Sequence, residues 1–140
     1  MGLALDTSTL IGLLSGSRKI RSAIADQEAL GLVPVLSTVV AFEALSGVEF
    51  TRSKAERARL ESLIRHLPLE DFTLEAARVA GELRADLRRV GRSPSAPDVM
   101  IAGQALAGGH SLMTGDRLLS RSASVMGLTV ILVEDESGSL

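Results

Sequence analysis

The fold is decided near the amino terminus, where residues 3–11 read LALDTSTLI. An apolar run ends at Asp6, and this pattern predicts a short buried strand over residues 3–6. Thr7 or Ser8 can cap the helix that follows. The same order, a short apolar strand and then a helix, recurs along the rest of the chain.

Outward from this stretch, strands and helices alternate. Further strands are predicted over residues 32–38, 67–72, 111–114 and 129–134, and helices over 17–29, 38–47, 54–67, 74–90, 97–107 and 116–126. Thr38, Ser53 and Thr73 are the expected caps of three of these helices. The alternation predicts a single α/β domain over residues 1–140, with a central, mainly parallel sheet flanked by helices on both faces and a loose tail over residues 134–140.

Composition narrows the function. The 140 residues are 46% apolar and 23% charged, which is typical of a chain that buries a core. The chain has no cysteine, so thiolate metal sites and thiol nucleophiles are excluded. No apolar run is long enough to span a membrane and no secretory signal is visible, so a cytoplasmic protein without a membrane partner is expected. The net charge of −2 means that any nucleic-acid binding must depend on local basic patches.

Four acidic residues stand where the local pattern predicts burial or the end of an element: Asp6, Glu43, Asp98 and Asp116. Asp6 and Asp116 follow apolar strands, and Asp98 opens a helix of small residues. Glu43 lies about one turn into the helix that leaves the second strand. All four therefore map to the edge of the sheet at which parallel strands end, where ligands bind in such folds.

Carboxylates that share a crevice repel one another, and a divalent cation relieves that repulsion. Because the ligands are all oxygen, Mg²⁺ or Mn²⁺ is the expected ion. Taken singly, Asp6 or Asp116 is equally well explained as a helix cap, and Asp98 as a first-turn acid that complements the helix dipole. Glu43 resists such an explanation because its neighbours in sequence are apolar.

Four segments that carry these acids resemble a PIN-domain ribonuclease of the VapC toxin type. They are LALDTSTLI (3–11), STVVAFEALSG (37–47), PDVMIAGQALAGG (97–109) and LMTGDRLLS (112–120), in the order of that family. The resemblance implies that Asp6, Glu43, Asp98 and Asp116 are the metal-binding and catalytic acids. It also implies that the hydroxyls of Thr7, Ser8 and Thr114 surround them. Some relatives carry a fifth acid two residues after the TGD aspartate, where this chain has Leu118.

The expected reaction is hydrolysis of an RNA phosphodiester by metal-activated water. The resemblance further implies a cognate antitoxin protein and a homodimer. The apolar stretch from Val39 to Phe50, with the helix around Leu60 and Ile64, forms either an antitoxin-binding groove or plain core.

Arginines near the acids are candidates for holding RNA phosphates: Arg89, Arg92, Arg117 and Arg121. The alternative is a solvated helix face whose arginines pair with Glu82 and Asp86. Arg18, Lys19 and Arg21 are interpreted as surface charge, and His66 and His110 as structural or surface residues.

Two other functions remain open. One is a catalytically silent binding module. The other is a different Mg²⁺-dependent phosphoryl-transfer domain, but a phosphatase of the haloacid dehalogenase kind needs an aspartate where Ser8 stands. A receiver domain needs a late lysine, and no lysine follows Lys54.

Overall fold

The computed structural model describes residues 1–124 and 127–134. Its elements in chain order are β1 (Gly2–Leu5), α1 (Thr7–Leu14), α2 (Arg18–Ala29), β2 (Val33–Ser37), α3 (Thr38–Thr51), α4 (Lys54–His66), β3 (Leu69–Glu70), α5 (Leu74–Arg89), α6 (Ala96–Ala107), β4 (Ser111–Thr114), α7 (Arg117–Ser124) and β5 (Val130–Leu132). None of the helices in these ranges has both the length and the hydropathy needed to cross a membrane.

The strands form one sheet in the order β3-β2-β1-β4-β5, and every neighbouring pair is parallel. This confirms the predicted α/β class. The chain adds β2 and β3 on one side of β1, then crosses to add β4 and β5 on the other side. The carboxyl ends of β1 and β4 therefore flank the point at which the winding direction reverses, which is where open α/β sheets bind ligands.

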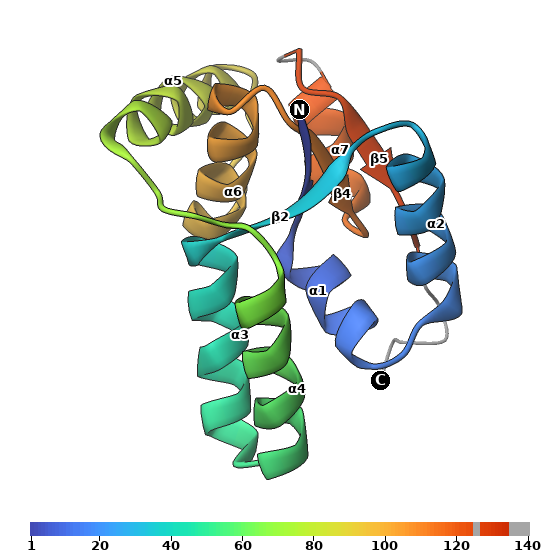
Figure 1. Ribbon diagram of the computed structural model, residues 1–140. Helices are drawn as coiled ribbons and strands as arrows, with labels where there is room; N and C mark the ends of the chain where they lie inside the picture. The colour runs from blue at the N-terminus through green and yellow to red at the C-terminus, as the bar shows by residue number, and fades with distance from the viewer. Residues whose placement is uncertain (125–126, 135–140) are drawn as a thin grey trace.

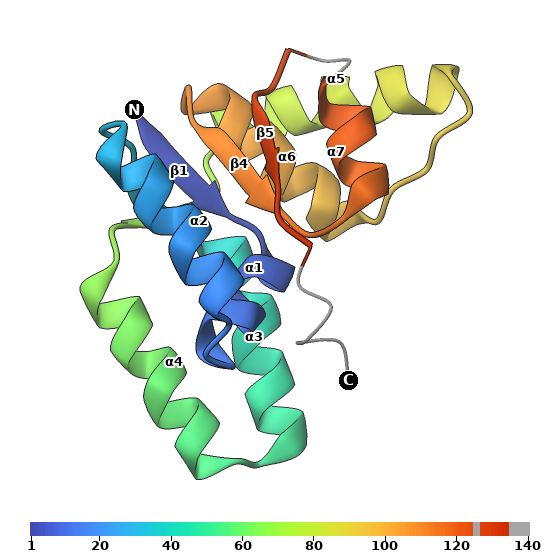
Figure 2. The ribbon, with the colours of Figure 1, turned by 90° about the vertical axis from the view of Figure 1, so that its right-hand side faces the viewer.

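All four residues of β4 and three of the four residues of β1 are buried, so both faces of the sheet are covered. Leu3, Leu5 and Met113 pack with α2, whereas Leu112 packs with the helices of the other face. Figure 1 shows α2 on one side of the sheet and the α5–α6 pair on the other. Figure 2 shows α3 and α4 running side by side as a hairpin that extends away from the sheet. The expectation of helices on both faces is confirmed.

Helix α6 packs against α5 as well as the sheet, because its small residues allow close approach. A Cβ atom added to Gly103 would lie 2.5 Å from the Cα atom of Ala80 in α5. Ala102 and Ala105 are also buried. The small-residue helix is therefore core, as expected, although its closest backbone contact is with α5.

Two predicted helix caps are wrong by one residue. Asp6, not Thr7 or Ser8, caps α1, because its extended backbone lets the side chain accept the Thr9 N–H. Ser37, not Thr38, caps α3 and accepts the Val39 N–H. Ser53 and Thr73 cap α4 and α5 as predicted.

The edge strands are shorter than predicted. Instead of residues 67–72, β3 spans only Leu69–Glu70, because its partner β2 ends at Ser37, which pairs with Glu70. The Gln104 side-chain amide donates to the carbonyls of Glu70 and Asp71 at 3.1 Å each. The predicted strands over 32–38 and 129–134 shorten to β2 and β5. The end of the predicted helix at 125–126 and the tail residues 135–140 lie outside the described residues.

Candidate functional site

Asp6 lies directly after β1 and is nearly buried, with 5% of its surface exposed. Its Oδ1 atom accepts the Thr9 N–H at 2.8 Å and the Ser8 hydroxyl at 2.9 Å. Its Oδ2 atom accepts the Thr114 hydroxyl at 2.5 Å. Three donors therefore hold the carboxylate in one fixed orientation.

Thr114 and Ser8 join the ends of β1 and β4. The fully buried Thr114 hydroxyl donates to Asp6 and accepts the Asp116 N–H at 3.0 Å. Ser8 likewise donates to Asp6 and accepts the Gly115 N–H at 3.2 Å. A Cβ atom on Gly115 would lie 3.2 Å from the Val133 carbonyl oxygen and 3.4 Å from Ser8 Oγ, so this turn has little room for a side chain.

Glu43 and Asp116 come to the same edge on different helices. Glu43 lies on α3 and is partly buried, and the Thr7 hydroxyl donates to its Oε1 atom. Asp116 precedes α7, and its Oδ1 atom accepts the N–H groups of Leu118 and Leu119 at 2.9 and 3.2 Å. All three hydroxyl residues expected near the acids thus contact an acid or the turn that carries one.

Asp98 lies in the first turn of α6, whose N-cap is Ser95. Burial raises the pKa of the Asp98 carboxyl above its ordinary value, and the Ser95 hydroxyl partly opposes that effect. The charges of Asp116, Glu43 and Asp6 raise this pKa further. Because the charges of all three other acids raise the pKa of Asp98, the four carboxylates share one electrostatic environment.

The donor set fits a hard divalent cation. None of the four acids forms an ion pair within residues 1–124 and 127–134. In the same residues, no three carboxylate or imidazole groups lie close enough to hold one ion directly. Mg²⁺ is nevertheless compatible, because it is usually bound through one or two carboxylates and keeps several waters.

The arginines near the crevice contact other side chains. Arg89 pairs with Asp86 at 2.5 Å, as its alternative interpretation proposed, and Arg92 donates to Ser122 Oγ at 3.3 Å. Arg117 pairs with Glu134, and both Arg117 and Arg121 are exposed on α7. The sequence interpretation missed Glu134, because a residue 17 positions away gives no local pairing signal.

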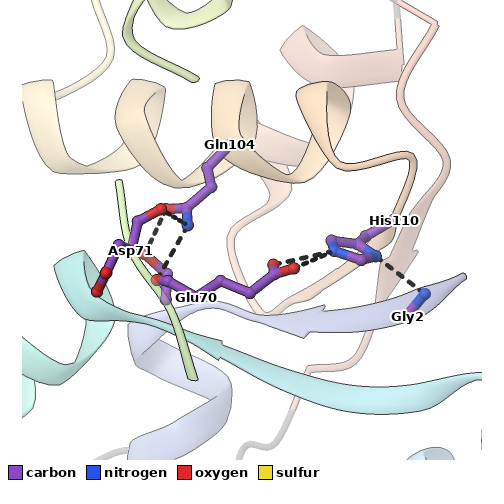
Figure 3. Close-up of polar contacts among 6 residues, drawn as sticks. Gly2, Glu70, Asp71, Gln104 and His110 are labelled. Atoms are coloured by element: carbon purple, nitrogen blue, oxygen red, sulfur yellow. Dashed lines mark hydrogen bonds and ion pairs between the residues drawn. The ribbon is translucent and has the colours of Figure 1, made fainter. Parts of the chain in front are cut away.

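His110 has a structural environment, as expected, at the opposite edge of the sheet. Its Nδ1 atom accepts the Gly2 N–H at 2.9 Å, and its Nε2 atom lies 2.9 Å from Glu70 Oε1 (Figure 3). Gln104 extends this network to the carbonyls of Glu70 and Asp71. His66 contacts the Ser62 carbonyl of its own helix at 2.6 Å. Neither histidine lies with the acids.

A family model and several solved structures are similar to this chain. A family model described as the PIN domain matches residues 3–124. The structure of VapBC2 from Rickettsia felis, bound to a DNA fragment from its promoter, contains a chain with a TM-score of 0.81 and 22% identity. That alignment covers 96% of this chain and 100% of the other.

A chain of DNA-bound VapBC from Salmonella typhimurium has a TM-score of 0.76 and 26% identity, covering 94% of this chain and 97% of the other. A chain of VapBC-5 from Mycobacterium tuberculosis has a TM-score of 0.69 and 23% identity, covering 96% of this chain and 100% of the other. No curated protein sequence matches this chain.

Proposed function

Because the chain belongs to the PIN-domain family, we propose that it is a Mg²⁺- or Mn²⁺-dependent ribonuclease and the toxin of a toxin–antitoxin pair. PIN domains are in general nucleases. The observation that carries the proposal is the convergence of Asp6, Glu43 and Asp116 on Asp98, whose pKa is raised by burial and by their charges. The family match covers most of the chain, so the receiver and phosphatase alternatives are not retained.

The residues of this chain have separate roles in the proposed reaction. Asp6, held by Ser8, Thr9 and Thr114, is the most rigid of the acids and would be a main ligand of the cation. Glu43 and Asp98 would be the other main ligands, directly or through water, and Asp116 would complete the shell or orient the nucleophile. The chemistry that a divalent cation supplies when bound is a lowered pKa of water and neutralisation of charge on phosphate.

Cleavage of a single-stranded oligoribonucleotide, with and without Mg²⁺, tests this proposal. The wild-type protein should cleave in Mg²⁺ and lose activity in EDTA, and Asp98→Asn should lower the rate by at least about 100-fold because it removes a ligand charge. Glu49→Gln is a matched control on exposed surface. A folded wild-type protein that never cleaves RNA would instead favour the silent binding module.

We extend the proposal to an antitoxin partner, a dimer and the cytoplasm. The antitoxin partner is supported by the similar VapBC structures, one of which is described as a member of the VapBC family of toxin–antitoxin systems. A hollow of about 230 Å³ between α1, α3 and α4 is lined by apolar residues, including Ile11 and Val48, with Glu43 among its lining residues. Phe42 and Phe50, two of the three phenylalanines, are 66% and 90% exposed on α3.

The sequence predicts either a groove or core for the stretch from Val39 to Phe50 and the helix around Leu60, and some of their residues are core whereas others line the hollow. Leu60 and Val40 are fully buried core residues outside the lining of the hollow, whereas Ala44 and Val48 pack in the core and also line it. Expression of the chain should arrest growth, and co-expression of the small protein encoded beside it should relieve the arrest. Light scattering of the purified chain measures its oligomeric state.

A further inference from the structure

A second hollow, of about 530 Å³, lies between α2 and the end of β5. Helix α2 contributes Lys19, Ser22, Ala23 and Asp26, and the other wall is formed by residues 132–134. Its volume lies within the range of roughly 300–1,000 Å³ that is typical of small-molecule sites. The metal site proposed above does not use any of these residues.

The carboxylate of Glu134 lies between this hollow and Arg117. Arg117 Nε donates to Glu134 Oε1 at 2.5 Å, and Arg117 Nη2 donates to Oε2 at 2.8 Å, so the pair is bidentate. Both Arg117 and Lys19 act on the same carboxylate. The hydrogen bonds from Arg117 hold the pKa of Glu134 below its ordinary value, and the charges of Arg117 and Lys19 add to this effect.

One wall of the hollow contacts the turn that carries Asp116. The Val133 N–H donates to the Thr114 carbonyl at 2.8 Å, and the Val133 carbonyl lies against Gly115. Arg117 follows Asp116 directly. The wall of the hollow therefore contacts Thr114 and Gly115, which are neighbours of the acids in the proposed site.

We propose that this hollow and the adjoining Arg117 form a phosphate-binding subsite for the RNA chain, in which Lys19 and Arg117 bind a backbone phosphate after it displaces the Glu134 carboxylate. The inference rests on the proposed ribonuclease function, since it assigns a place to the substrate of that same site. Glu134 then acts as an internal competitor that occupies the arginine when RNA is absent.

The chemistry of the groups favours phosphate. A guanidinium fork binds phosphate and carboxylate with the same bidentate geometry, and Lys19 adds a point charge. The Ser22 hydroxyl offers a further donor, whereas Asp26, the other acid among the described lining residues, repels the ligand. Because Arg117 is 67% exposed and Glu134 30% exposed, water screens the pair, so it is weakly stabilising and replaceable by a polyanion.

Binding of a fluorescent oligoribonucleotide without added metal, measured by anisotropy over a range of salt, tests the subsite. Glu134→Gln should tighten binding about three- to tenfold and steepen the salt dependence by about 0.7 log unit per log unit of salt, because one more cation is free to neutralise a phosphate. Lys19→Gln should weaken binding and flatten that slope by a similar amount. The variant that carries both substitutions should bind RNA less tightly than Glu134→Gln alone.

Matched controls lie on the same helix. Glu28→Gln and Arg18→Gln make the same charge changes at exposed α2 positions outside the lining of the hollow. If Glu134→Gln and Lys19→Gln change affinity no more than these controls, the subsite is overturned. Cleavage in Mg²⁺ by the same wild-type preparation separates the two proposals: cleavage with unaltered binding refutes the subsite alone, whereas an inactive wild type refutes the ribonuclease.

Discussion

At the scale of single residues, Asp6 has two structural roles. It caps α1 through the Thr9 N–H and also receives the Ser8 and Thr114 hydroxyls at the end of β1. The helix-cap explanation of this aspartate is therefore correct, yet it does not compete with a metal-binding role. One carboxylate oxygen serves the cap and Ser8, while the other faces Thr114.

Replacing Thr114 with valine should both destabilise the protein and lower its activity. The buried hydroxyl donates to Asp6 Oδ2 and accepts the Asp116 N–H, so its loss removes this partner from both groups. The cost should be about 1–3 kcal/mol, or roughly 3–10 °C in Tm. Thr114→Ser keeps the hydroxyl and should retain most of both properties; equal losses in the two variants would assign the effect to packing.

Asp98 should make the stability of the metal-free protein depend on pH. Its folded-state pKa is raised above the unfolded value by burial and by three neighbouring acids. Its contribution to stability is therefore present below the unfolded pKa and is lost as pH rises through the folded pKa. The Tm of Asp98→Asn relative to wild type should therefore increase between pH 4 and pH 7. A constant difference across that range would contradict the proposed environment of Asp98.

At the scale of elements, the close contact between α5 and α6 determines where Asp98 lies. Gly103 allows α6 to approach Ala80, and the amino terminus of the same helix carries Asp98. The site therefore depends on helix packing that lies one to two turns away from its carboxylates.

Two glycine substitutions should act in opposite directions. Gly103→Ala would place a Cβ atom 2.5 Å from Ala80 Cα, so overpacking should cost about 1–3 kcal/mol and displace α6. Gly81→Ala on α5 meets no atom within 4 Å and should stabilise the helix by about 0.5–1 kcal/mol. Denaturant unfolding of both variants measures these changes; a harmless Gly103→Ala would show that the helices can separate without cost.

Hydrophobic pattern predicts most elements of this fold because strands and helices alternate in short, well-bounded segments. The pattern does not predict features that depend on contacts between residues distant in sequence. The length of β3 depends on its partner β2, whose last residue, Ser37, pairs with Glu70, 33 positions later in the sequence. The pairing of Arg117 with Glu134 likewise depends on where β5 ends, which no local spacing encodes.

At the scale of the whole molecule, the strand order brings the four acids together. The winding reverses between β1 and β4, so Asp6 and Asp116 leave adjacent strands at the same edge. Glu43 and Asp98 reach that edge near the beginnings of α3 and α6. The sequence predicts this convergence because all four acids follow the carboxyl-end rule of parallel sheets.

Divalent cations should stabilise the folded chain, since they bind the crevice and not the unfolded protein. At a free Mg²⁺ or Mn²⁺ concentration 100 times the dissociation constant, the gain is about 2.7 kcal/mol. Thermal unfolding should show a rise in Tm that is smaller in Glu43→Gln. Glu49→Gln, on the exposed side of the same helix, is the control and should respond as the wild type does.

The most direct test of the central claim is the anomalous scattering of a crystal soaked in Mn²⁺. The account predicts a peak in the crevice, about 2.0–2.5 Å from a carboxylate oxygen of Asp6 or Asp98, which is the range of such metal–oxygen contacts. The peak should disappear in Asp98→Asn crystals treated in the same way. A wild-type crystal with no peak among the four acids at saturating Mn²⁺, or with its ion bound elsewhere, would contradict the account.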